Sequence, residues 1–421
     1  LLLNNHAAGV LVDPKKVFFN FTRNTYMDKH FLFTPGPVNV ADNLRIAIAR
    51  KDICHREIEF DRLLLSIERK LLSLFQIRNK NDYRAVVITG SGTAANEAML
   101  SSAVGDKNIL ILSNGEFGER LHAISKIHNT NTFLLEFPWG SCLDLDVIGA
   151  FLQRHPIDVI AMVHHETSSG MLNSLEDIGA LSKSNGSLFI VDCVSSAGAE
   201  PIDMERDNIA FCSSSSSKAI GSYAGLSFVI GETAEFEKLK TLPVKSAYLN
   251  LYKFYDFLKT YSQTPNTPAV PLFFAFEQAL TNILKEGVAS QHAKIKRKAA
   301  LLRKGMSKLG LNFLLDPKDM CSVLTTVFIP PHISVAHFQQ KLRKKSIIIY
   351  EGKGCFKGRV FQVGNIGELS NRDIRFFLAA QKEILEGFKR QAPTQVASVR
   401  DHIQRLPIFN EQGPLVRGGI L

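Results

Sequence analysis

Short apolar runs alternate with helical patterns along the chain from about residue 84 to residue 230. Six of these runs predict strands because they are short, apolar and rich in β-branched or aromatic residues. They span 85–88, 109–112, 158–163, 188–191, 209–211 and 226–230. The spacing of apolar residues between the runs predicts helices, among them 93–104 and 178–185. This alternation predicts an α/β fold with a mainly parallel sheet, and the lack of polar alternation indicates strands buried on both faces.

A second pattern begins in the last third of the chain. Residues 271–309 predict a long helix, with or without an interruption, that leads into a region at about 311–388. Strand patterns such as 325–329 and 347–350 alternate there with helical ones, which favours a smaller α+β domain. The first 30 residues and about the last 30 have weak periodicity. We therefore expect four parts: an N-terminal arm at 1–30, a large domain at 31–280, a small C-terminal domain at 281–389 and a tail at 390–421.

The composition is that of an ordinary globular protein. Of 421 residues, 45% are hydrophobic and 21% are charged, which excludes a disordered tail protein and a disulfide-rich mini-domain. The formal net charge of +10 suits anionic substrates or nucleic acid. The basic residues are scattered, however, and no interleaved aromatic and basic motif accompanies them. We therefore expect no nucleic-acid partner.

The cysteines and the apolar segments bear on the compartment. Six cysteines without any C-x-x-C pair indicate neither a zinc site nor a disulfide framework. No apolar stretch reaches the roughly 18 to 20 residues that a membrane span needs. Residues 1–12 lack the charged start and the continuous apolar region of a signal peptide. We therefore expect reduced thiols, no membrane association and a cytoplasmic location.

A glycine-rich turn, T-G-S-G-T at 89–93, follows a predicted strand and leads into the helix at 93–104. Backbone N–H groups at a helix start, small residues and hydroxyl donors make such a turn suitable for holding an anion. An ordinary strand-to-helix turn has the same composition and is the alternative. The turn lacks the lysine and the spacing of a P-loop, so we do not expect a nucleoside triphosphate site of that kind.

Two ionisable residues stand after predicted strands. Asp192 directly follows the run 188–191, where a carboxylate must be paired or hydrogen-bonded; a helix N-cap is the alternative. Lys218 follows five serines, 213–217, that come after the run 209–211. A linker would not normally join two core strands, and a lysine there can form an imine with an aldehyde if desolvation lowers its pKa. A solvent-exposed lysine is the alternative.

Two adjacent histidines, His164 and His165, precede Glu166 after the strand at 158–163. Adjacent side chains on a strand point in opposite directions. The glutamate does not create the H-E-x-x-H spacing of a zinc site. We therefore expect no metal ion at these residues or elsewhere.

The order and spacing of these features resemble the class V aminotransferases of the pyridoxal-phosphate fold type I group. The anion loop, the aromatic Phe117, the E-T-S-S-G motif at 166–170 and Asp192 follow one another, and Lys218 comes 26 residues after Asp192. The resemblance covers about residues 32–385 and, within that class, is strongest to the 2-aminoethylphosphonate–pyruvate transaminases. The motifs that carry it are 33–37, 90–93, 113–115, 162–164, 166–167 with 170–173, 190–192 and 364–368.

The resemblance implies a large domain with a mainly parallel seven-stranded sheet, a smaller C-terminal α+β domain and pyridoxal 5'-phosphate as cofactor. Lys218 would hold the cofactor as an internal aldimine and carry the proton between substrate and cofactor. Asp192 would pair with the pyridinium nitrogen and keep it protonated. The other cofactor-binding residues that the resemblance implies are Ser91, Gly92, Thr93, Phe117, Thr167, Val194, Ser217, Thr264 and Thr267. Thr264 and Thr267 match a loop that reaches the cofactor phosphate of the neighbouring subunit, so a homodimer is implied.

One departure from the family pattern concerns the acid group of the substrate. The family usually has an arginine just before Gly364, whereas this chain has Gln362. A neutral amide cannot supply the charge-assisted bidentate pair of a guanidinium. Arg359 lies three residues earlier and would face the other way on a regular strand. We hypothesise that Arg56 partly replaces the missing charge, with a structural ion pair to a nearby glutamate as the alternative. Gly36, Arg56 and Gln362 are the candidate substrate-binding residues.

The expected reaction is amino transfer from 2-aminoethylphosphonate to pyruvate, which gives phosphonoacetaldehyde and alanine, or the reverse reaction. The partners would be a small amino donor and a keto acid. Alanine or serine aminotransferases that use glyoxylate or pyruvate share the same motifs and are the main alternative. Cysteine desulfuration would need a reactive cysteine, for which Cys321 and Cys355 lie in the small domain. A protein that binds the cofactor without turnover is a further alternative.

Overall fold

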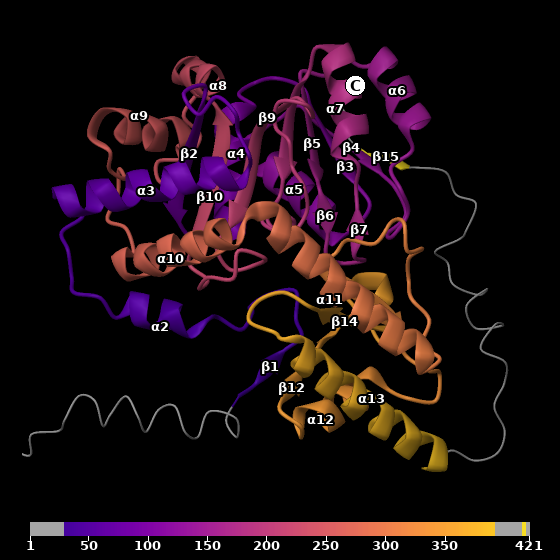
Figure 1. Ribbon diagram of the computed structural model, residues 1–421. Coiled ribbons are helices and arrows are strands. Elements are labelled where there is room, and N and C mark those ends of the chain that lie inside the picture. Colours follow the sequence, from indigo (N-terminus) through magenta and orange to yellow (C-terminus); the bar gives the residue numbers. More distant parts are fainter. Residues whose placement is uncertain (1–28, 392–414, 418–421) are drawn as a thin grey trace, which may run out of the picture.

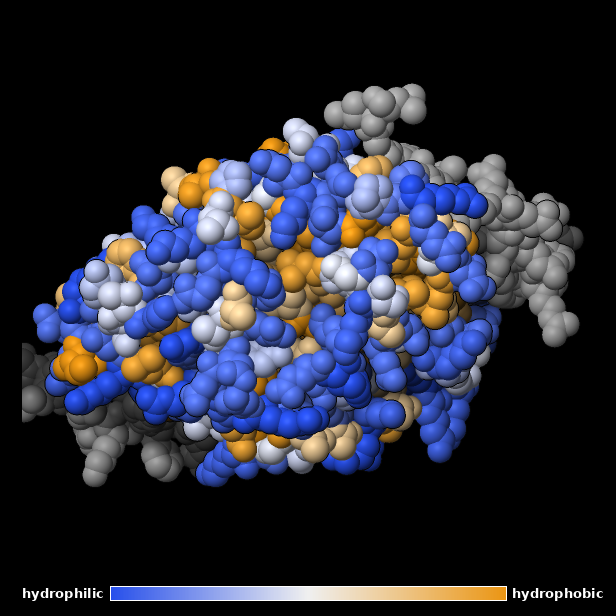
Figure 2. Space-filling model, turned by 90° about the horizontal axis from the view of Figure 1, so that it is seen from above, coloured by the Kyte–Doolittle hydropathy of each residue, from blue (hydrophilic) through white to orange (hydrophobic). Residues whose placement is uncertain are grey.

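The computed structural model describes residues 29–391 and 415–417 and shows a large α/β part beside a smaller C-terminal part (Figure 1). The arm expected at 1–30 and the tail expected at 390–421 therefore lie almost entirely outside the described residues. Among the helices that are described, none is both long and apolar enough to cross a bilayer. Seen from above (Figure 2), the surface is mainly hydrophilic, with hydrophobic residues in small groups between polar ones.

An eight-stranded sheet with the order β15-β4-β3-β5-β8-β9-β10-β2 forms the centre of the large part. Its strands are β2 (Tyr83–Thr89), β3 (Ile109–Ser113), β4 (Thr132–Glu136), β5 (Val159–Val163), β8 (Leu188–Asp192), β9 (Ile209–Ser215), β10 (Leu226–Glu232) and β15 (Leu415–Arg417). The strands from β4 to β9 in this order pair in parallel. β10 is antiparallel to β9 and β2, and β15 is antiparallel to β4. The mainly parallel sheet is thus confirmed, and β15 adds a strand to the expected seven.

The strands differ from the sequence-based expectation at two places. β4, with the sequence T-F-L-L-E, is not among the predicted runs. β9 continues through Ser213, Ser214 and Ser215, which are buried. The Ser213 hydroxyl donates to Asn96 Oδ1, and the Ser214 hydroxyl donates to Cys193 O at 3.1 Å. Hydroxyl groups with such partners can be buried in a strand, so Ser213 and Ser214 belong to the core.

Helices pack around the sheet (Figure 1). They are α2 (Asp42–Ile48), α3 (Ile58–Leu74), α4 (Gly92–Ala103), α5 (Glu116–His128), α6 (Leu145–Arg154), α7 (Leu175–Asn185), α8 (Thr233–Lys238), η1 (Leu239–Thr241), α9 (Leu251–Tyr261) and α10 (Val270–Glu286). α4 contacts β9 and β10, and α5 contacts β3, β4 and β5. The helices predicted at 93–104 and 178–185 are confirmed. α7 begins three residues earlier than predicted, at Leu175, because the Ser174 hydroxyl accepts the N–H of Asp177 and caps the helix.

The long helix expected at 271–309 is two helices, α10 and α11 (Val288–Lys308), that meet at Gly287. Gly287 has a φ of +91°, in the left-handed region where other residues are strained. The interruption is therefore set by a glycine.

The smaller part contains an antiparallel sheet with the order β11-β14-β13. Its elements are β11 (Leu324–Phe328), α12 (Val335–Arg343), β12 (Ile347–Ile348), β13 (Tyr350–Glu351), η2 (Gly354–Phe356), β14 (Val360–Gly364) and α13 (Asn371–Gln391). β12 pairs in parallel with β1 (Phe31–Leu32), so Phe31 and Phe33 pack in the same apolar core as residues from Leu302 onward. The domain boundaries expected from the sequence stay a prediction.

The carboxyl ends of β3, β5, β8 and β9 lie at one edge of the sheet because these strands are parallel. The hairpin of β6 (His165–Glu166) and β7 (Met171–Leu172) follows β5 at this edge, on the side of the smaller part (Figure 1). Ligands of open α/β sheets bind at such an edge. The predicted site residues that follow strands are thus brought to one side of the sheet.

Candidate active site

Asp192 ends β8 with its carboxylate buried and hydrogen-bonded through both oxygens. Its Oδ2 accepts a hydrogen bond from Asn96 Nδ2 at 2.6 Å, and its Oδ1 accepts one from the Val194 N–H at 2.8 Å. Asn96 Oδ1 in turn accepts from the Ser213 hydroxyl. Burial raises the pKa of the Asp192 carboxyl, and these hydrogen bonds oppose the increase. A turn and not a helix follows Asp192, so the side chain is held at the sheet edge rather than used as a helix cap.

Lys218 follows β9, and its amine points into the protein. Its Nζ donates to Pro35 O at 3.0 Å. Gly36 lies against the side chain, since a Cβ at Gly36 would be 2.7 Å from Lys218 Cδ and 2.8 Å from Nζ. Burial lowers the pKa of Lys218 to about 8; the charge of Asp192 opposes this change, and two nearby cations support it. The structure therefore favours a partly buried amine with a lowered pKa over a solvent-exposed lysine.

The lowered pKa predicts how the reactivity of Lys218 depends on pH. Only the neutral amine attacks a carbonyl group, and below a pKa of about 8 its fraction rises about tenfold per pH unit. We expect imine formation between the cofactor-free protein and an aromatic aldehyde to accelerate up to about pH 8 and then level off. An exposed lysine would continue to accelerate to about pH 10.

Stopped-flow absorbance measures this rate, and Lys218→Ala should remove the fast phase. A fast phase that keeps rising well beyond pH 9 would contradict the lowered pKa of about 8.

The start of α4 has the properties of an anion site. Ser91 is the N-cap residue, and its side chain makes no cap hydrogen bond. Ser91 and Thr93 are exposed. Gly92 packs against Val194, because a Cβ at Gly92 would lie 2.6 Å from Val194 Cγ2. N–H donors at a helix start and the positive end of the helix dipole favour an anion, so the expected phosphate-binding residues have suitable donors and access.

Phe117 lies in the first turn of α5, which Glu166 caps. Glu166 Oε2 accepts hydrogen bonds from the N–H groups of Phe117 and Gly118, both at 3.1 Å. Its Oε1 accepts from the Ser168 N–H and hydroxyl. Burial raises the pKa of Glu166 to about 7, although these hydrogen bonds lower it. Glu166 therefore positions the first turn of α5 and with it the Phe117 ring.

The two adjacent histidines are core residues. His165 Nδ1 lies 3.1 Å from Ser195 O. Burial lowers the pKa of His164 to about 3 and that of His165 to about 4. Both rings are therefore neutral at physiological pH.

Gln362 joins the smaller part to the loop after β6. It is buried, and its Nε2 donates to Thr167 O at 2.8 Å and to Ser168 O at 3.0 Å. The two amide hydrogens thus have acceptors within the protein. Arg359 is exposed and lies just before β14. A role of Gln362 in substrate binding stays a prediction, because its donors already bind the main chain.

Arg56 holds the loop that carries Thr264 and Thr267. Its Nη1 donates to Gln263 Oε1 at 3.0 Å and to Thr264 O at 2.8 Å. Thr264 is buried and donates to Asn266 O at 2.9 Å, whereas Thr267 is exposed. Arg56 therefore makes hydrogen bonds to this loop. They take the place of the ion pair with a nearby glutamate that was the alternative.

Direct contacts join one group of the predicted site residues and leave another group apart. The joined residues form two sets: Gly36 lies against Lys218, and Gly92 lies against Val194, whose N–H donates to Asp192. Arg56, Thr264 and Thr267 form the second group. Of the remaining predicted residues, Thr167 is buried and Ser217 is half-buried. The roles assigned to all of these residues stay predictions.

Sequence reasoning missed the residues that hold the site together. Asn96 binds Asp192 from the second turn of α4, and the two residues lie too far apart in the chain for a local pattern to link them. The sequence contains no pattern that predicts the capping role of Glu166, because the groups that it caps are the main-chain N–H groups of a distant helix.

Comparisons with known proteins show the family of this chain. The sequence model of the family described as aminotransferase class-V matches residues 48–368. A protein of Phocaeicola vulgatus named 2-aminoethylphosphonate–pyruvate transaminase is 31% identical over 363 residues, which cover 85% of this chain and 99% of that protein. A protein of the same name from Aeromonas hydrophila is 32% identical over 359 residues, which cover 83% of this chain and 94% of that protein.

A solved structure shows the same architecture. The alanine–glyoxylate aminotransferase of a Nostoc species matches with a TM-score of 0.80 at 26% identity, over 85% of this chain and 95% of that chain. This similarity confirms the pyridoxal-phosphate fold type I architecture expected from the sequence. Since the family match and both named relatives extend over most of its length, this chain belongs to the class V aminotransferase family and is an aminotransferase.

Proposed function

We propose that this protein transfers the amino group of 2-aminoethylphosphonate to pyruvate, or catalyses the reverse reaction, with pyridoxal 5'-phosphate as cofactor. The single observation that supports amino transfer most strongly is the placement of the Lys218 amine, whose pKa is lowered, and the buried Asp192 carboxylate after neighbouring parallel strands. The choice of donor is supported by the relatives named for this reaction, which are 31% and 32% identical.

The described residues fit this cofactor. When bound, it would accept the electrons released as the α-proton of the substrate leaves. Lys218 would hold the cofactor's aldehyde carbon and move the proton, since a pKa of about 8 suits both tasks. Asp192 would keep the ring nitrogen protonated. Ser91, Gly92 and Thr93 would hold the phosphate through hydroxyl and N–H donors.

We also propose a homodimer located in the cytoplasm. The loop that Arg56 holds exposes Thr267, which would then reach the phosphate of the partner's cofactor. All six cysteines are free, which fits a reducing compartment.

A second candidate is amino transfer from alanine or serine to glyoxylate or pyruvate. Gln362 does not separate the two candidates, because the carboxylate of alanine or serine would use the same positive charge as a phosphonate. The Nostoc relative is named alanine–glyoxylate aminotransferase.

Cysteine desulfuration has less support. Burial raises the pKa of Cys321 to about 12 and also raises the pKa of Cys355. A thiol that acts as a nucleophile needs a lowered pKa instead.

Visible absorbance of the purified protein tests the proposal. 2-Aminoethylphosphonate, alanine and serine are added separately, without a keto acid, to the protein loaded with cofactor. We expect 2-aminoethylphosphonate to convert the absorbance of the pyridoxal form to that of the pyridoxamine form. Conversion by alanine or serine alone would select the second candidate. Failure to load the cofactor would contradict both.

Arg56→Ala tests the hypothesis that Arg56 contributes charge to substrate binding. The change removes a cation and two hydrogen bonds to the Gln263–Thr264 loop. We expect the apparent affinity for 2-aminoethylphosphonate to fall about tenfold, as for the loss of a charged hydrogen bond. Steady-state kinetics measures this effect, with Arg62→Ala, an exposed position on α3, as the matched control. If Arg56→Ala left the affinity for every amino donor unchanged, the hypothesis would be abandoned.

A further inference from the structure

The acid group of the proposed donor needs positive charge that position 362 does not supply. Gln362 is neutral, and its amide donates to the carbonyl groups of Thr167 and Ser168. A phosphonate carries at least one negative charge near neutral pH, and proteins bind such groups with guanidinium and ammonium groups. The positive charge must therefore come from another element.

Two cations gather at Phe117, the residue proposed to lie against the cofactor ring. Arg120 Cζ lies 4.6 Å and Lys353 Nζ lies 5.1 Å from the centroid of the Phe117 ring. Arg120 belongs to α5 in the large part, whereas Lys353 precedes η2 in the smaller part. Both donate to Glu116 Oε1, at 2.8 Å and 3.0 Å respectively. We call Arg120 and Lys353 the cation pair; it brings charge from both parts of the protein to one place.

The charges of the cation pair act on Lys218. Burial is the largest cause that lowers the pKa of Lys218, and the charge of Asp192 raises it. The positive charges of Lys353 and Arg120 lower it further. The segment that carries Lys353 is also tied to Lys218 by contacts. The Tyr350 hydroxyl donates to Gly36 O at 3.2 Å, and Gly36 lies directly against the Lys218 side chain. The short segment from Tyr350 to Lys353 thus joins the cation pair to the loop that lies on Lys218.

The segment around Lys353 is held firmly against α5. A Cβ at Gly354 would lie 2.5 Å from the Trp139 ring, so the loop packs closely on this ring. Trp139 Nε1 donates to Glu119 Oε1 at 2.6 Å, and Glu119 is the neighbour of Arg120. The two cations are thus positioned before a ligand arrives, which lowers the entropy cost of binding.

The cation pair can accept a further anion. Two cations face one carboxylate, Glu116, which leaves a formal charge of +1 on the group. The Arg120 and Lys353 side chains are 38% and 43% exposed. Arg120 and Lys353 each have further N–H donors besides the one that binds Glu116. A phosphonate has three acceptor oxygens and can bind both cations at once.

We propose that Arg120 and Lys353 together bind the phosphonate group of the amino donor and supply the charge that Gln362 lacks. This inference rests on the proposed function and adds to it the residues that select a phosphonate.

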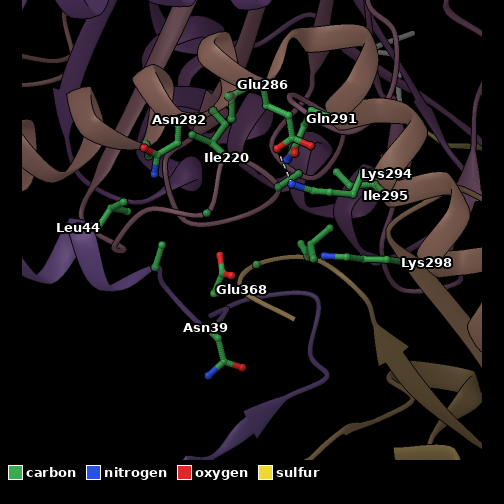
Figure 3. Close-up of a pocket in the computed structure, with 17 residues that line it drawn as sticks. Asn39, Leu44, Ile220, Asn282, Glu286, Gln291, Lys294, Ile295, Lys298 and Glu368 are labelled. Carbon is green, nitrogen blue, oxygen red and sulfur yellow. Dashed lines mark hydrogen bonds and ion pairs between the residues drawn. The ribbon is translucent and has the colours of Figure 1, made fainter. Parts of the chain in front are cut away.

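Another group of lysines does not meet the same requirements. Lys294 and Lys298 line a cavity of about 90 Å³ among α10, α11 and residues 366–368 (Figure 3). Glu286 pairs with Lys294 at 2.5 Å, and Glu368 lines the same cavity. The two carboxylates equal the two cations in number, so an acid group would gain little net attraction there.

Matched variants of the cofactor-loaded enzyme test the proposal. Arg120→Gln and Lys353→Gln each remove one charge, and Lys357→Gln, exposed on the same segment, is the control. Calorimetry measures the binding of methylphosphonate, which has the acid group but no amine. Absorbance measures the conversion by 2-aminoethylphosphonate. We expect each charge-removing variant to weaken both interactions about ten- to hundredfold, whereas Lys357→Gln stays within about twofold.

Arg120→Lys keeps the charge and should retain most of the affinity, which separates loss of charge from a folding defect. The proposal is overturned if both charge-removing variants bind methylphosphonate as the wild type does, or if the wild type does not bind it. Failure of the proposed function looks different. In that case the wild type would bind methylphosphonate through the cation pair, but 2-aminoethylphosphonate would not convert the cofactor.

Discussion

Lys218→Ala is expected to lower the rate of amino transfer by at least about a thousandfold, in line with the loss of a general acid and base. The reason is the placement of this amine, which donates to Pro35 O at 3.0 Å and has its pKa lowered to about 8 by burial. Single-turnover absorbance measurements with excess amino donor give the rate. A small primary amine added to the variant should restore part of it, because it can replace the missing proton carrier.

Lys344→Ala is the matched control for this prediction, since Lys344 is exposed at the end of α12. Circular dichroism of both variants reports whether the fold is intact. Transfer by Lys218→Ala within about tenfold of the wild-type rate would contradict the assignment of Lys218 as the proton-transferring residue.

Asp192→Asn is expected to lower the transfer rate by about a hundred- to a thousandfold, because a neutral amide cannot keep the cofactor nitrogen protonated. The side chain keeps its size, but an amide has a single oxygen for two donors. The N–H of Val194 and the amide of Asn96 each donate to a separate Asp192 oxygen. One of them would lose its acceptor, at a cost of about 1 to 3 kcal/mol.

The same variant should change the titration of Lys218 in the cofactor-free protein. The negative charge of Asp192 raises the pKa of Lys218 and partly offsets the effect of burial. Its removal should therefore move the pH profile of imine formation to lower pH. A profile at the wild-type position would show that Asp192 exerts no charge effect on Lys218, and a wild-type transfer rate would contradict its proposed role.

The strands show how much of the fold a local pattern determines. Six strands of the large sheet were predicted, because a strand buried on both faces is a continuous apolar run. β4 and β15 were not predicted; their sequences are T-F-L-L-E and L-V-R. The predicted ends of the helices and strands were less accurate than their centres. A helix cap such as Ser174 or a polar strand end such as Ser213 depends on a hydrogen-bond partner, which a local pattern does not contain.

For the candidate site too, some residues could be selected from the sequence and others could not. Asp192 and Lys218 could be selected because each follows an apolar strand pattern, and parallel strands end at one edge of the sheet. The motif order supplied the family, which the comparisons confirm. The partner of Asp192 could not be selected, because Asn96 lies 96 residues earlier in the chain.

By itself, the sequence determined the α/β class, the mainly parallel sheet and the family, and it selected Asp192 and Lys218 as candidate residues, since these depend on periodicity and on motifs along the chain. Only the tertiary structure decided which side chains meet. It binds the donors of Gln362 to Thr167 and Ser168, and it brings Lys353 to Glu116 from 237 residues away. Local periodicity records which face of an element is buried, whereas hydrogen bonds and ion pairs between distant segments depend on how the elements pack together.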